Sequence, residues 1–154
     1  MSYFFLDSSA LVKRYLTETG TLWVDTLTDP SAGNTIVVAE ITLVEVAAAL
    51  AARHRAGAIT LEERDEAVDL LHEHYDAEYR ITPVSREILD RAVSLTQNHR
   101  LRGYDAVQLA TALTTNNSLA EADLPELTLV AADEDLVSAA RAEGLTSDDP
   151  NRHP

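Results

Sequence analysis

Four acidic side chains stand where an isolated charge would be costly: Asp7, Glu45, Asp105 and Asp133. The first and the last follow short apolar runs, 3–6 and 127–131, and the other two lie among apolar residues with helical spacing. Without Cys or paired His, a cluster of carboxylates suits a hard, oxygen-liganded cation such as Mg²⁺ or Mn²⁺. Such ions activate water and offset the charge that develops on a phosphodiester. The chemistry therefore depends on whether the four acids converge.

The elements that must position these acids alternate between strands and helices. Short apolar runs predict strands at 3–6, 35–39, 80–84 and 127–131, with a last short strand near 145–146. Apolar residues three and four apart predict helices at 10–16, 22–27, 41–56, 60–75, 85–95, 104–115 and 134–142. This alternation predicts an α/β domain around a mostly parallel sheet of four to five strands. In such sheets ligands bind beyond the C-terminal ends of the strands, where Asp7 and Asp133 are expected.

The chain of 154 residues has the length of one domain, which we expect at 1–147, followed by a frayed C-terminal tail at 148–154. Its composition, 45% hydrophobic and 25% charged, is typical of a soluble globular protein. No apolar run approaches the roughly 20 residues that cross a bilayer, and a basic signal-peptide start is missing. We therefore expect a cytoplasmic protein with no membrane partner.

Absent residue types exclude several other chemistries. The chain has no Cys, so thiol nucleophiles, disulfides, Fe–S clusters and Cys-based zinc sites are ruled out. Its five Gly residues are too widely spaced for a Walker A loop or a dinucleotide-binding G-x-G-x-x-G motif. Neither H-E-x-x-H nor G-x-S-x-G occurs.

The formal net charge of −14 argues against nucleic acid as a ligand, because Lys and Arg bind phosphate backbones. Most of the acids are expected on a solvated surface. Taken singly, Asp7, Asp105 and Asp133 could each serve only to cap a helix N-terminus. Their joint placement with Glu45, at two strand ends and on two apolar helices, favours a site.

Four segments give the chain a resemblance to the PIN-domain family, and within it to the VapC-type toxins of bacterial and archaeal toxin–antitoxin pairs. The segments are Phe5-Leu6-Asp7-Ser8-Ser9-Ala10-Leu11-Val12-Lys13, Glu40-Ile41-Thr42-Leu43-Val44-Glu45-Val46, Leu101-Arg102-Gly103-Tyr104-Asp105-Ala106-Val107-Gln108-Leu109-Ala110, and Leu129-Val130-Ala131-Ala132-Asp133-Glu134-Asp135-Leu136. The resemblance extends from Phe4 to about Leu145, and the third segment is its most specific part.

The resemblance implies a three-layer α/β/α sandwich and a role for each acid. Asp7, Glu45, Asp105 and Asp133 correspond to the family's acidic quartet, which binds Mg²⁺ or Mn²⁺, and Ser9 is an accessory hydroxyl. Asp7 and Asp105 are expected to bind the ion directly, with Glu45 and Asp133 completing the cluster or holding waters. Two features depart from a clear match: Ala131 stands where the family often has Ser or Thr, and Asp135 could share the role of Asp133.

The implied activity is that of an endoribonuclease toxin that hydrolyses RNA phosphodiester bonds with a cation-activated water. By the same resemblance, the chain would form a homodimer and a hetero-oligomer with a small antitoxin. RNA phosphates would need nearby positive charge, for which the candidates are Arg100, Arg102, Lys13 and Arg14.

Two other classes of function compete with a ribonuclease. The first is a non-catalytic, acidic Mg-binding module that sequesters a basic partner. The second is a phosphotransfer domain, which is disfavoured because Ser9 stands where dehalogenase-like enzymes have a second Asp. Receiver domains also need a Lys late in the chain, whereas the only Lys is Lys13.

Overall fold

Strand side chains alternate between two hydrophobic layers, and this alternation places the sheet in the middle of the molecule. In the computed structural model, which describes all residues 1–154, Tyr3 and Phe5 of the first strand face one buried cluster. Leu6 of the same strand belongs to a second buried cluster. A strand buried on both faces reads as a continuous apolar run, which is why Tyr3-Phe4-Phe5-Leu6 has no polar residue.

The sheet is entirely parallel, with the order β3-β2-β1-β4-β5. Its strands are β1 Tyr3–Leu6, β2 Thr35–Ala39, β3 Arg80–Thr82, β4 Leu127–Val130 and β5 Thr146–Asp148. The first strand of the chain is therefore the central one, paired with β2 on one side and β4 on the other. The parallel direction brings the C-terminal ends of all five strands to one edge, as predicted.

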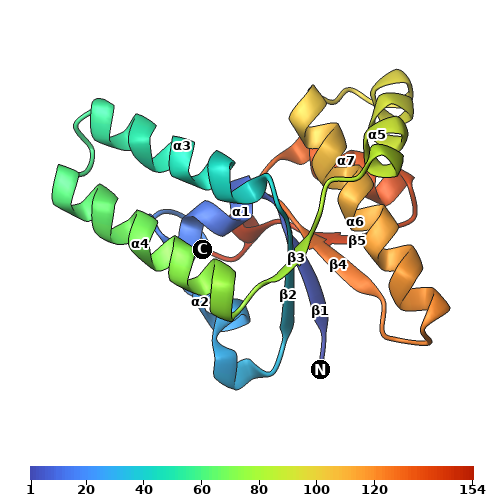
Figure 1. The fold of residues 1–154 in the computed structure, drawn as a ribbon, viewed down its shortest axis with the longest axis horizontal. Helices are drawn as coiled ribbons and strands as arrows, with labels where there is room; N and C mark the ends of the chain where they lie inside the picture. Colours follow the sequence, from blue (N-terminus) through green and yellow to red (C-terminus); the bar gives the residue numbers. More distant parts are fainter.

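Helices cover both faces of the sheet and complete three layers (Figure 1). On one face lie α1 Ser8–Leu11, α2 Thr21–Thr28, α3 Thr42–Arg55 and α4 Leu61–Ala77, with the 3₁₀ helices η1 Val12–Arg14 and η2 Pro30–Ala32. On the other face lie α5 Arg86–Asn98, α6 Gly103–Glu121 and α7 Glu134–Ala142. The predicted α/β/α sandwich with a parallel sheet is confirmed.

Local sequence signals place several helix starts correctly. Thr60 and Glu63 form a capping box at the start of α4, in which each side chain accepts from the other residue's backbone N–H. Ser85 caps α5 by accepting from the backbone N–H of Ile88. The strand β3, which Pro83 follows, lies at one edge of the sheet, where a Pro disrupts no ladder. The sixth α-helix continues to Glu121, beyond the predicted end near 115, because its apolar face keeps packing on the sheet.

The C-terminal residues differ from the predicted frayed tail. Residues 146–148 form the edge strand β5, and the 3₁₀ helix η3, Pro150–Arg152, then folds back over α2. Asp149 and Pro150 are buried, and the His153 ring stacks on Trp23 with 4.2 Å between ring centroids. The domain therefore includes residues 148–154, since apolar and aromatic contacts outweigh the polar composition of the segment.

Gly20 makes room for this C-terminal segment. Its φ of +87° is left-handed, and a Cβ at this position would lie 2.4 Å from the carbonyl oxygen of Pro150. Gly57 has a similar φ of +77°, but open space surrounds its Cα.

We predict that Gly20→Ala destabilises the protein more than Gly57→Ala does. Both substitutions add left-handed strain of roughly 1–2 kcal/mol, but only the first adds a backbone clash that displaces residues 149–154. Denaturant unfolding monitored by the fluorescence of Trp23, the only Trp, measures both effects. Gly20→Ala alone should also change the native emission, because His153 leaves the indole; equal behaviour of the two variants would contradict this account.

Candidate functional site

The first acid of the predicted quartet, Asp7, is buried at the C-terminal end of the central strand. The residue is only 2% exposed. One of its carboxylate oxygens accepts a hydrogen bond from the backbone N–H of Ala10 at 3.0 Å, and this bond caps the N-terminus of α1. Burial raises the pKa of Asp7 to about 7, and the nearby Asp105 and Glu45 add to the rise. At neutral pH this carboxyl therefore lies near the midpoint of its titration.

Ser9 connects Asp7 to the neighbouring strand end. Its hydroxyl lies 2.7 and 2.9 Å from the two Asp7 carboxylate oxygens and donates to that group. The same hydroxyl accepts from the backbone N–H of Ala132, just after β4, at 2.9 Å. Ser9 thus makes a hydrogen bond to the segment after β4 in which Ala131 stands at the position where the family often has a hydroxyl residue.

The second acid, Glu45, lies in the first turn of α3 and has a donor on each carboxylate oxygen. Ser8 Oγ donates to Oε2 at 3.0 Å, and Gln108 Nε2 donates to Oε1 at 2.7 Å. Neither donor was among the predicted site residues. The available signal was weak: Gln108 is a polar residue three positions after Asp105, within the largely apolar run 106–113 of α6.

The third and fourth acids approach each other from α6 and α7. Asp105 is buried in the first turn of α6, and burial together with the nearby Asp133 raises its pKa to about 6. Asp133 caps α7 by accepting from the backbone N–H of Leu136 at 3.1 Å. The more distant Asp135 is exposed and contributes least to the raised pKa of Asp105, so Asp133 is the better placed of the two.

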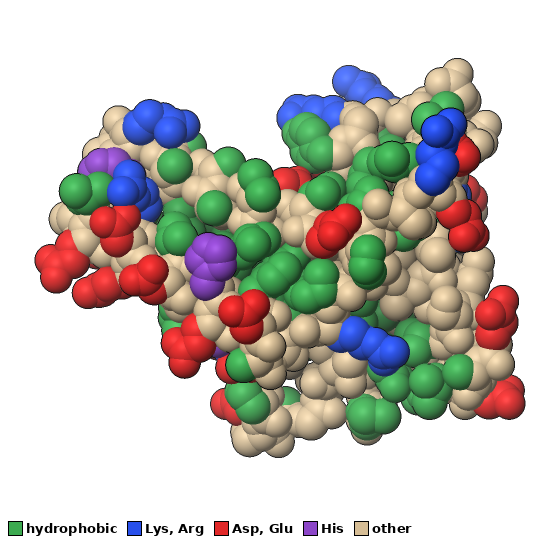
Figure 2. Space-filling view, viewed as in Figure 1, with side chains coloured by type: hydrophobic (Ala, Val, Ile, Leu, Met, Phe, Trp, Pro, Cys, Tyr) green, Lys and Arg blue, Asp and Glu red, His purple; other side chains and the backbone are tan.

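A polar pocket of about 450 Å³ opens beside Asp105 and Asp133. Both of the predicted arginines near α6 line it, and the full lining is Thr96, His99, Arg100, Leu101, Arg102, Asp105, Asp133 and Asp135. A hydrogen bond to Tyr104 and the nearby Asp105 and Asp133 carboxylates raise the pKa of Arg102. Figure 2 shows acidic atoms at the base of a notch between the two helical layers, with basic side chains on the rims.

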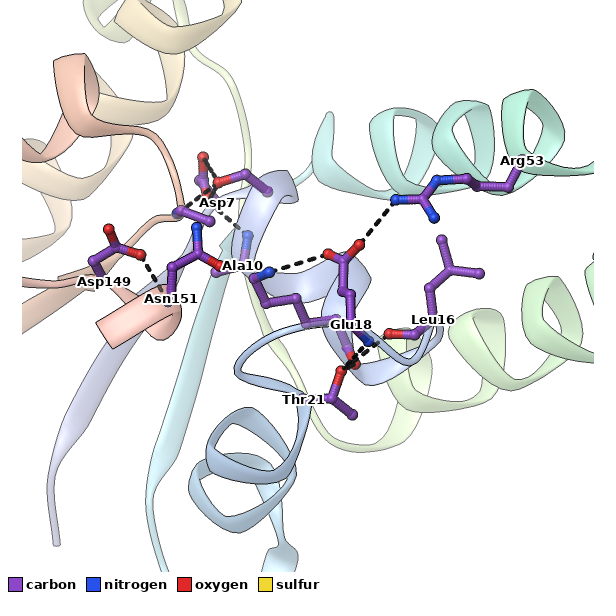
Figure 3. Close-up of polar contacts among 11 residues, drawn as sticks. Asp7, Ala10, Leu16, Glu18, Thr21, Arg53, Asp149 and Asn151 are labelled. Carbon is purple, nitrogen blue, oxygen red and sulfur yellow. Dashed lines mark hydrogen bonds and ion pairs between the residues drawn. The ribbon is translucent and has the colours of Figure 1, made fainter. Parts of the chain in front are cut away.

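The other two predicted RNA contacts, Lys13 and Arg14, form ion pairs within the chain. Lys13 is buried and lies 3.1 Å from Glu18, which in turn pairs with Arg53 of α3 at 2.9 Å (Figure 3). Arg14 donates to Glu78 and to the Tyr79 hydroxyl at 2.9 and 2.8 Å. Neither side chain lines the pocket that holds Arg100 and Arg102, so an RNA contact by Lys13 or Arg14 stays a prediction.

The donor set fits a divalent cation that keeps part of its water shell. All four groups are oxygen donors, and their proximity is evident in the raised pKa values of Asp7 and Asp105. No three acidic or histidine side chains lie close enough together to hold a metal ion in the orientations that the structure shows. One buried side-chain atom, Gln108 Oε1, has no hydrogen-bond partner and could accept from water. Because Mg²⁺ commonly retains several waters and uses one or two carboxylates, this arrangement suits it better than a dry cage would.

Comparison with known proteins identifies related folds. A family model described as PIN domain matches residues 4–142. No curated protein matches the chain.

None of the helices combines the length and apolarity that a membrane crossing requires.

Solved structures with this fold include proteins of toxin–antitoxin pairs. VapBC2 from Rickettsia felis, bound to a DNA fragment from their promoter, aligns with a TM-score of 0.63 and 14% identity over 96% of this chain and 98% of that one. A toxin–antitoxin complex from Klebsiella pneumoniae gives 0.57 and 20% identity, covering 87% and 89%. Mycobacterium tuberculosis VapC20, a Sarcin-Ricin loop cleaving toxin, gives 0.56 and 14% identity, covering 88% and 94%.

We predict that the metal-free protein loses stability as the pH rises from 5 to 8. Unfolded Asp has a pKa near 3.9, whereas folded Asp7 titrates at about 7. Between these values the folded state holds a proton that the unfolded chain has released, so the free energy of unfolding falls with rising pH. Thermal unfolding in EDTA should show a smaller pH dependence for Asp7→Asn than for the wild type.

The matched control for this measurement is Asp69→Asn, which removes an exposed acid from α4. It should leave the pH dependence as in the wild type. An equal slope in wild type and Asp7→Asn would show that Asp7 does not hold its proton in the folded state.

Proposed function

This chain belongs to the PIN domain family, and we propose that it is a Mg²⁺- or Mn²⁺-dependent endoribonuclease that acts as the toxin of a toxin–antitoxin pair. The observation that carries the proposal is the buried Asp7 carboxyl, which accepts hydrogen bonds from Ser9 and Ala10. Burial and the nearby acids raise its pKa to about 7, and no cationic side chain neutralises its charge. Asp7 also caps α1, but capping does not neutralise its buried charge, which a bound divalent cation would compensate.

The roles that we assign to the acids follow their surroundings. Asp7 and Asp105 would hold the ion directly, since both are buried and both have raised pKa values that a cation would lower. Glu45, held by Ser8 and Gln108, and Asp133, which caps α7, would orient water. When bound, the ion would supply an activated water and offset the charge on the phosphodiester. Ser9 would keep the Asp7 carboxylate in one orientation.

The pocket chemistry supports a phosphate-containing substrate. Arg100 and Arg102 line the same pocket as Asp105 and Asp133, so positive charge lies where a phosphate would approach the acids. Arg102 donates to the Tyr104 hydroxyl at 2.7 Å, which restricts the guanidinium without removing its charge. With Lys13 and Arg14 engaged elsewhere, this pair is the proposed RNA contact.

RNA as the substrate and an antitoxin as the partner are supported by the nature of the structural neighbours. VapC20 is described as cleaving the Sarcin-Ricin loop, an RNA element, and the Klebsiella and Rickettsia structures are toxin–antitoxin assemblies. A surface with a formal net charge of −14 would attract a basic antitoxin segment and would steer the partners together. A homodimer and a cytoplasmic location complete the proposal.

We predict that RNA cleavage requires both a divalent cation and Asp7. Metal-based activation contributes several kcal/mol, so EDTA or Asp7→Asn should each reduce cleavage by at least about 100-fold. Labelled RNA incubated with purified protein measures the effect, and added Mn²⁺ should restore the EDTA-treated wild type but not the variant. Asp69→Asn serves as the control and should cleave like the wild type.

The outcomes separate the nuclease from its main competitor. Cleavage that persists in EDTA would contradict the metal mechanism. Mn²⁺ binding without cleavage of any RNA would instead favour a non-catalytic acidic module that sequesters a basic partner.

We predict that Arg102→Glu weakens RNA binding and reduces its salt dependence. Loss of one phosphate contact should lower the slope of log K against log salt by about one. Arg80→Glu makes the same change in charge at the N-terminal end of β3, on the opposite edge of the sheet, and should have little effect. Filter binding at several salt concentrations measures both variants; indistinguishable slopes would remove Arg102 from the RNA-binding surface.

A further inference from the structure

A glutamine outside the acidic quartet, Gln108, is buried within the site. The residue is 1% exposed, and its Nε2 lies 2.7 Å from Glu45 Oε1 and 3.0 Å from Thr42 Oγ1. Both hydrogens of the amide group therefore have an acceptor on α3. Burying an amide costs free energy unless it is hydrogen-bonded, so these two hydrogen bonds offset the cost of burying the Gln108 amide nitrogen.

The hydrogen-bond partners fix the orientation of the Gln108 amide. In the flipped orientation, its carbonyl oxygen would face the Glu45 carboxylate, and two acceptors would repel each other. The observed orientation satisfies the nitrogen fully and leaves Oε1 as the one buried side-chain atom without a partner. The orientation that hydrogen-bonds Glu45 is therefore also the one that leaves the Gln108 carbonyl oxygen unpaired.

Gln108 also connects two acids that belong to different layers of the molecule. It lies three residues after Asp105 on α6, so the two side chains share one face of that helix. Asp105 contributes to the acid cluster, and Gln108 reaches across to Glu45 on α3. The spacing between Asp105 and Glu45 is therefore set by a direct contact between the helices that carry them.

The contact also reduces the freedom of Glu45. A glutamate side chain loses up to about 1.5–2 kcal/mol of rotamer entropy when it is fixed. Gln108 and Ser8 together impose that restriction before any cation arrives, and each carboxylate oxygen retains a further lone pair.

We propose that Gln108 is a positioning residue that acts through Glu45, and that it prepares the acid cluster for the cation. This inference rests on the proposed metal-dependent function. It assigns Gln108 no contact with the substrate or with the ion.

The test is Mn²⁺ binding to RNA-free protein, measured by calorimetry on the wild type, Gln108→Met, Glu45→Ala and the double variant. Methionine keeps the length of the side chain but has no N–H donor. Loss of a group that orients a metal ligand costs about 10–100-fold in affinity, so we expect Gln108→Met to weaken Mn²⁺ binding by about 10-fold. In the Glu45→Ala background, the same substitution should change the affinity by less than about 2-fold, because the group it acts through is gone.

Thr111→Val is the matched control for disturbance of the core. Thr111 is fully buried on the same helix, and its hydroxyl donates only to the Val107 carbonyl, at 2.7 Å. It should bind Mn²⁺ like the wild type, while urea unfolding records the stability of every variant.

Three outcomes would count against these assignments, and they are distinguishable. Wild-type affinity in Gln108→Met would overturn the role of Gln108 and leave the proposed function standing. An equal loss with and without Glu45 would show that Gln108 acts on the fold and not through Glu45, which also overturns the inference. A wild type that binds no Mn²⁺ would overturn the proposed function itself.

Discussion

The burial of one carboxyl group, Asp7, at the end of the central strand constrains the rest of the site. Its hydrogen bonds from Ser9 and Ala10 compensate only part of the lost hydration, and the neighbouring acids make ionisation harder still. A proton or a cation on this group would therefore stabilise the site. Because β1 lies in the middle of a parallel sheet, the other strand ends and the first turn of α6 surround the same point.

Two chains of hydrogen bonds hold the acids around that point. Ser9 joins Asp7 to the backbone after β4, so the first and fourth acidic segments are connected through one hydroxyl. Ser8, Glu45 and Gln108 join α1, α3 and α6 in the same way. These hydrogen bonds orient the Asp7 and Glu45 carboxylates in the absence of a bound ion.

The basic residues of this acidic chain differ in their surroundings. Lys13, Arg14 and Arg53 form ion pairs within the helical layer around α1, α3 and α4. Arg100 and Arg102 instead line the acidic pocket at the start of α6. An anionic ligand would therefore find positive charge beside the acids of this pocket, although the net charge of the chain is repulsive. Such a charge distribution favours selectivity over non-specific affinity.

The sequence by itself determined the strands and most helix starts, because these depend on local patterns: apolar runs, helical spacing and capping residues such as Thr60 and Ser85. It also singled out the four acids as candidates for a site. Only the tertiary structure decided which neighbours each polar group found. Lys13 and Arg14 paired with Glu18 and Glu78, the C-terminal segment packed on Trp23 and Gly20, and Gln108 reached Glu45 from 63 positions away in the chain. Such contacts join residues that are distant in sequence, and their partners depend on how helices pack across the sheet, which no local pattern encodes.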